Sequence, residues 1–93
     1  MDRVFVEYQN FQRISFLEDS HPKGDYENCI FTSCIFANTH LSNINFIDCT
    51  FNHCDFSLVK VSNTAFRDCK IKDCKILGVK FEECNTFGFA IHF

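Results

Sequence analysis

The sequence predicts an all-β fold in which a short strand and a turn alternate every five residues and wind into a four-sided helix. Three observations support this fold. Two residue positions in every five carry no charge between residues 24 and 84. The pattern recurs after twenty residues, as in the segments NCIFTSCIF, DCTFNHCDF and DCKIKDCKI. All seven cysteines fall on the five-residue spacing, at Cys29, Cys34, Cys49, Cys54, Cys69, Cys74 and Cys84.

The two uncharged positions differ in side-chain size. One is large and apolar from Tyr26 to Phe81, and the other is small or β-branched from Gly24 to Cys84. An amphipathic helix needs apolar residues three and four apart and a regular strand needs strict alternation, so neither explains a period of five. Two inward residues separated by one outward residue fit a very short strand followed by a turn.

Four such sides complete one coil of twenty residues, so residues twenty apart are predicted to stack at the usual strand spacing of about 4.8 Å. Cysteine is predicted to stack on cysteine and phenylalanine on phenylalanine or isoleucine. Burying one Phe contributes roughly 1.5–3 kcal/mol, so the Phe columns should dominate stability. The predicted core is Cys29, Phe31, Cys34, Phe36, Leu41, Phe46, Cys49, Phe51, Cys54, Phe56, Phe66, Cys69, Ile71, Cys74, Ile76, Phe81 and Cys84.

The chain is interpreted as a single domain, residues 1–93, in three parts. Residues 1–23 are predicted to form an N-terminal cap and a loop, because the repeat is weaker there and breaks at LEDSHPKGD, around Pro22. Residues 24–84 contain the clear repeats. Residues 85–93 are predicted to form an incomplete last coil.

The last part of the sequence is apolar, with Phe87, Phe89, Ile91 and Phe93 and no charged residue after Glu83. An uncovered end of a β-helix exposes apolar side chains and unpaired backbone groups. Two explanations remain open: a partner covers this end, or the chain is the first part of a longer β-helix. The first predicts self-association through the C-terminal coil, most simply as a two-fold homodimer.

Composition excludes several functions. A net charge of −3 has the wrong sign for direct nucleic-acid binding. The opening MDRVFVEYQN contains neither a secretory signal nor a membrane span, so we expect a cytoplasmic protein with reduced thiols. Cys49, His53 and Cys54 could suggest a metal, but the two cysteines face inward and His53 outward. No catalytic constellation or cofactor motif is present, so we expect neither an enzyme nor a bound cofactor.

The repeating motif resembles that of the pentapeptide repeat family. It consists of a small residue, a polar residue, Leu or Phe, and two variable residues, as in CDFSL from Cys54 and CKIKD from Cys69. The resemblance covers residues 24–84. It implies a right-handed quadrilateral β-helix with four repeats per coil and a solid interior, here with about three to four coils.

The stretch DCKIKDCKILGVKFEECNTFGF is similar to the first half of the quinolone-resistance and gyrase-interacting members of that family. Those proteins mimic B-DNA in width and negative surface and dimerise through their C-terminal coil. The resemblance therefore implies a protein partner, DNA gyrase or topoisomerase IV. The weak negative charge and short length weaken this inference, and an alternative stays open: a purely structural or scaffolding repeat protein, or a fragment of a longer β-helix, with no topoisomerase role.

Overall fold

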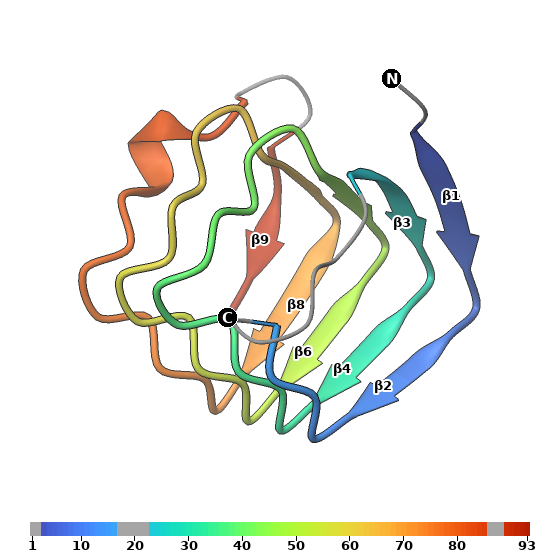
Figure 1. Ribbon diagram of the computed structural model, residues 1–93, viewed down its shortest axis with the longest axis horizontal. Coiled ribbons are helices and arrows are strands. Elements are labelled where there is room, and N and C mark those ends of the chain that lie inside the picture. The colour runs from blue at the N-terminus through green and yellow to red at the C-terminus, as the bar shows by residue number, and fades with distance from the viewer. Residues whose placement is uncertain (1–2, 17–22, 86–88) are drawn as a thin grey trace.

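The computed structural model describes residues 3–16, 23–85 and 89–93 and confirms the all-β prediction. The chain forms a right-handed β-helix of about four coils (Figure 1). The described strands are β1 (Val4–Glu7), β2 (Asn10–Gln12), β3 (Gly24–Glu27), β4 (Ile30–Thr32), β5 (Asn45–Ile47), β6 (Thr50–Asn52), β7 (Ala65–Arg67), β8 (Cys69–Lys72) and β9 (Ile91–His92). A 3₁₀ helix, η1 (Phe81–Glu83), follows β8.

Two sides of the β-helix are parallel sheets, with strand orders β1-β3-β5-β7 and β2-β4-β6-β8-β9. Phe31 pairs with Phe51, and Phe51 pairs with Ile71, which is the predicted twenty-residue register. The other two sides are held by single bridges, such as Ile35 with Asp55. Successive coils therefore stack in register on all four sides.

The corners of the β-helix depend on a residue position that the sequence reasoning did not single out. One residue in each five-residue unit has a positive φ, from 53° at Asn28 to 75° at Gly78. Asn, Asp and Gly tolerate this left-handed conformation better than other residues. They occupy most of the positions, namely Asn28, Asn38, Asn43, Asp48, Asn63, Asp68, Asp73 and Gly78.

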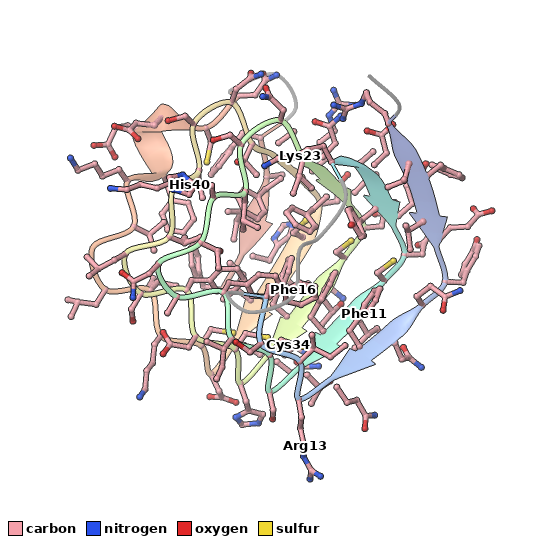
Figure 2. The ribbon with its side chains drawn as sticks, in the orientation of Figure 1. Phe11, Arg13, Phe16, Lys23, Cys34 and His40 are labelled. Atoms are coloured by element: carbon pink, nitrogen blue, oxygen red, sulfur yellow. The ribbon has the colours of Figure 1, made fainter. Side chains whose placement is uncertain are left out.

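Phenylalanine columns fill the interior, as predicted. The rings of Phe31 and Phe51 stack with centroids 4.9 Å apart and planes 10° apart, and those of Phe36 and Phe56 stack at 4.9 Å and 3°. The first coil extends both columns, because Phe11 stacks on Phe31 at 4.9 Å and Phe16 stacks on Phe36 at 4.6 Å. Figure 2 shows Phe11 and Phe16 directed into the β-helix and Arg13 directed out from a corner.

The small inward residues also hold the coils together through hydrogen bonds. The Cys49 thiol donates to the Tyr26 carbonyl at 3.2 Å, and the Cys69 thiol donates to the Phe46 carbonyl at 3.3 Å. The Thr64 hydroxyl donates in the same way to the Leu41 carbonyl at 2.7 Å. Cysteine therefore supplies a weak donor as well as a compact apolar volume. All seven thiols are free.

The predicted core residues are buried in the structure, with three exceptions in the last coil. Cys74 and Phe81 are half-buried. The core assignment of Ile76 is wrong, because this side chain is 36% exposed. Among the described residues, the strand above this coil covers only Cys69 and Lys70, so no side chain stacks over Ile76.

The twenty-residue register is also wrong at this end. It would place Ile91 over Ile71, whereas the structure pairs Ile91 with Cys69, twenty-two residues away. The shift arises after Asn85. The Asn85 N–H still donates to the Thr64 carbonyl at 2.9 Å, in the same register as the Ala65 N–H and the Ile44 carbonyl, whereas the Ala90 N–H donates to the Phe66 carbonyl, twenty-four residues away.

Candidate functional site

The solid interior leaves the outer surface and the C-terminal end as candidate functional regions. Cys49 and Cys54 are buried, whereas the His53 side chain is exposed and its Nε2 lies 4.0 Å from Asp73 Oδ2. These groups do not converge. In residues 3–16, 23–85 and 89–93, no three His, Cys, Asp or Glu side chains are arranged to hold a metal ion.

The C-terminal end presents apolar side chains around Phe81. The rings of Phe89 and Phe93 make edge contacts with that of Phe81, at centroid distances of 6.4 and 6.2 Å. Phe89 is 39% exposed and Phe93 is 75% exposed, while Ile91 packs against the core. Phe87 lies outside the described residues. β9 therefore covers part of this end, and the rest of the end is exposed apolar surface.

Carboxylates project from one corner of the β-helix. Asp48 and Asp68 occupy this corner in successive coils, both exposed and both with φ of 53°. Asp25, on β3 of the adjacent side, pairs with Arg3 at 3.1 Å and accepts a hydrogen bond from Asn45 Nδ2 at 2.7 Å. The corner geometry thus spaces two free carboxylates one coil apart, along the axis.

The thiols differ in acidity. Burial raises the pKa of Cys49, and it raises the pKa of Cys69 to about 12 and that of Cys84 to about 11. Cys74 differs: its pKa is lowered to about 7, mainly by its hydrogen bond with the Cys54 side chain. The structure therefore places one acidic thiol at the end of the cysteine column.

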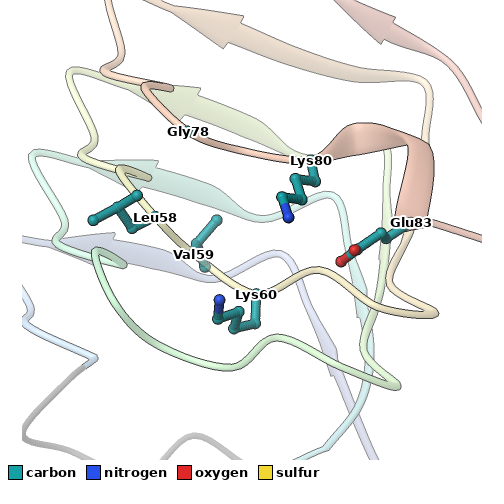
Figure 3. A pocket seen from close by; sticks show the side chains of 6 residues that line it. All are labelled: Leu58, Val59, Lys60, Gly78, Lys80 and Glu83. Carbon is teal, nitrogen blue, oxygen red and sulfur yellow. The ribbon is translucent and has the colours of Figure 1, made fainter.

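A pocket of about 290 Å³ lies on the side opposite the second sheet, between two successive coils. It is lined by Leu58, Val59, Lys60, Gly78, Lys80 and Glu83 (Figure 3). The twenty-residue register places Lys60 and Lys80 on one face, but it does not predict that a pocket separates them. No periodic signal could reveal it, because it forms where the repeat fails.

No helix in the described part of the chain is long and apolar enough to cross a membrane. The search of curated protein sequences found no match. The fold is similar to that of full-length QnrB1, a plasmid-mediated fluoroquinolone resistance protein, with a TM-score of 0.67 and 19% sequence identity. That alignment covers 84% of this chain and 49% of QnrB1, so the chain spans about half the length of that protein. A trypsin-treated variant of QnrB1 aligns with a TM-score of 0.39 and 18% identity, covering 96% of this chain and 50% of the variant.

A model of the pentapeptide repeat region matches residues 25–91, which is more than half of the sequence. The match begins within β3 and ends within β9, and it includes the cysteine columns and the phenylalanine columns from Phe31 onward. The chain therefore belongs to the pentapeptide repeat family.

Proposed function

We propose that this protein is a non-catalytic interaction module that binds a type II topoisomerase, DNA gyrase or topoisomerase IV, at the site that otherwise holds DNA. Family membership and a fold similar to that of a fluoroquinolone resistance protein support this proposal. The described residues form a body with extents of 29 × 26 × 22 Å and a filled interior. Its means of recognition is therefore its outer surface.

The observation that carries the proposal is the corner with Asp48 and Asp68. Both carboxylates are exposed, and rigid corners hold them one coil apart, about 4.8 Å along the axis. DNA presents its partners with regularly spaced negative charges on a stiff scaffold. A surface that binds DNA phosphates through Lys and Arg can bind a row of fixed carboxylates by the same ionic contacts.

The test is a gyrase supercoiling assay with and without the protein and a quinolone. We expect the protein either to inhibit supercoiling by gyrase or to protect supercoiling from inhibition by the quinolone. The double variant Asp48→Asn/Asp68→Asn should lose most of this effect, since Asn tolerates the positive φ and only charge is removed. Glu82→Gln/Glu83→Gln, in η1, is the control with the same change of charge. If both double variants lose the effect on supercoiling equally, or if the wild-type protein has no effect, the proposal is wrong and the alternative is a structural or scaffolding role.

The proposal includes self-association through the C-terminal coil. Phe89, Phe93 and Ile76 together expose apolar surface at this end, which favours contact with a second copy. Replacing Phe89 and Phe93 with Asp should give monomers in sedimentation experiments. Phe5→Asp, at an exposed apolar residue of β1, should leave the oligomer intact. A wild-type protein that sediments as a monomer at high micromolar concentration would exclude this part of the proposal.

A further inference from the structure

The pocket between Lys60 and Lys80 forms where the hydrogen bonds between coils lapse. One coil earlier, the Lys60 N–H donates to the Thr39 carbonyl at 2.9 Å and the Leu41 N–H donates to the Lys60 carbonyl at 2.8 Å. No corresponding bond joins Lys60 or its neighbours to Lys80 in the described part of the chain. The Lys80 carbonyl instead accepts the Glu83 N–H, at 3.0 Å, as η1 begins.

The opening is bounded on both sides by regular contacts. The Leu58 N–H donates to the Leu77 carbonyl at 2.9 Å, and the Asn63 N–H donates to the Glu83 carbonyl at 3.0 Å. The two coils therefore separate only between these points. The result is a local opening between two coils that are otherwise joined by hydrogen bonds.

Lys60 and Lys80 line this pocket from successive coils. Figure 3 shows the Lys80 side chain directed toward the gap, the Lys60 side chain on the lower side of its own coil, and the Glu83 side chain beside the gap. Neither lysine has an ion pair or side-chain hydrogen bond with any described residue. Like charges on neighbouring strands repel, and an anion held between them would turn this repulsion into attraction.

We propose that this pocket binds a small oxyanion, a phosphate or carboxylate group, through the ammonium groups of its two lining lysines, Lys60 and Lys80. The volume of about 290 Å³ admits a small molecule. Leu58 and Val59 give one wall a hydrocarbon surface, which would contact the short carbon chain of an organic acid. The site lies on a different side from the Asp48 corner, so it can exist whether or not the protein binds a topoisomerase.

Glu83 sets the affinity of this site. Its Oε1 accepts a hydrogen bond from Ser62 Oγ at 3.4 Å, which holds the carboxylate at the pocket wall. A bound anion would be repelled by this charge. Removing the charge should therefore tighten binding, an effect that general screening of the protein by salt would not produce.

The experiment is a titration of the folded protein with sodium phosphate and, separately, with sodium succinate, each against sodium chloride at matched ionic strength. Amide chemical shifts in ¹H–¹⁵N NMR spectra report the site. We expect saturable shifts confined to residues 58–63 and 78–83. Saturation by phosphate alone identifies a phosphate site, and saturation by succinate alone identifies a carboxylate site. No saturable shift with either anion would overturn the proposal.

Variants separate a built site from general charge effects. Lys60→Gln and Lys80→Gln should each weaken binding roughly tenfold, since each removes one charge-assisted contact. Glu83→Gln should tighten it several-fold. Lys70→Gln, on β8, removes the same charge outside the pocket and should leave the affinity unchanged. If Lys70→Gln weakens binding as much as Lys60→Gln, the shifts reflect general ionic effects and the proposal is wrong. Unchanged amide shifts elsewhere establish that each variant is folded.

Discussion

The Sγ atom of Cys74 accepts a hydrogen bond from the backbone N–H of Cys54, with an N–S distance of 3.2 Å. Cys74 is the last thiol of the column that includes Cys34 and Cys54, and it is half-buried where those two are buried. Hydrogen bonds to sulfur stabilise the thiolate over the thiol. They outweigh the desolvation of Cys74, which acts to raise its pKa.

We therefore predict that Cys74 is the fastest-reacting thiol of the folded protein. Its pKa of about 7 makes much of it thiolate at neutral pH, and it is more accessible than the buried thiols. Limited treatment with iodoacetamide followed by peptide mass spectrometry measures the reactivity of each cysteine. The rate at Cys74 should rise through about pH 7. Faster alkylation of Cys49 or Cys69 would contradict the prediction, and Cys74→Ser should remove the fast phase.

Stability should fall in alkaline solution. Burial raises the pKa of Cys49 and Cys69 in the folded state above the unfolded value, so their stabilising contribution is complete below about pH 9 and is lost as pH rises above it. Each thiol can contribute a slope of at most about 1.4 kcal/mol per pH unit. Cys74 acts in the opposite direction between about pH 7 and pH 9, since its pKa is lowered.

Urea unfolding between pH 7.5 and pH 10.5 measures this dependence. Cys69→Val introduces a residue that occupies the small inward position of another repeat, at Val59, and should reduce the loss of stability above pH 9. Equal slopes for the wild type and this variant would show that the buried thiol does not cause the alkaline effect.

Phe51→Ala should reduce the free energy of unfolding by about 3–5 kcal/mol. The Phe51 side chain is fully buried, stacks on Phe31 and makes edge contacts with Phe46 and Phe56 at 5.3 and 5.1 Å. Asn52→Ala, at the adjacent outward position, should change stability by less than about 0.5 kcal/mol. Denaturant unfolding measures the stability of both variants. If Phe51→Ala and Asn52→Ala lose similar stability, the inward and outward positions are misassigned.

Leu58→Asn should stabilise the protein by up to about 1 kcal/mol. Leu58 has φ of 59° and is 54% exposed. The left-handed conformation is unfavourable for Leu, and the small burial of its side chain does little to offset that cost. Gly78→Ala, one coil later, should destabilise it, because the added Cβ would lie 2.6 Å from Leu58 Cδ2 and φ is 75°. Thermal unfolding of both variants tests this. A destabilised Leu58→Asn would mean that the packing of Leu58 outweighs its backbone strain.

The sequence predicts the β-helix well because its repeat is a local rule applied many times. Spacing alone predicts the column positions of Phe31, Phe36 and Phe51, because residues twenty apart must stack once each coil has four sides. The alternation of large and small inward residues leaves no other face for them. The positive φ of Asn28 and Asp48 could also have been predicted, from the recurrence of Asn and Asp at one position of the repeat.

The C-terminal coil could not be predicted in the same way. At Glu83 the repeating positive φ is absent, and residues 81–83 form η1 instead. Two separate irregularities occur here: η1 lies beside the pocket at Lys60, and β9 pairs two residues out of register, a shift that arises after Asn85. The periodic signal gives no information about where it will fail.

The central claim, that this β-helix binds a type II topoisomerase in place of DNA, is tested most directly by fluorescence anisotropy with labelled protein and purified DNA gyrase. We expect saturable binding that unlabelled duplex DNA displaces. Asp48→Asn/Asp68→Asn should weaken this binding, whereas Glu82→Gln/Glu83→Gln should not. Anisotropy that stays flat at micromolar gyrase, or binding that duplex DNA fails to displace, would contradict it.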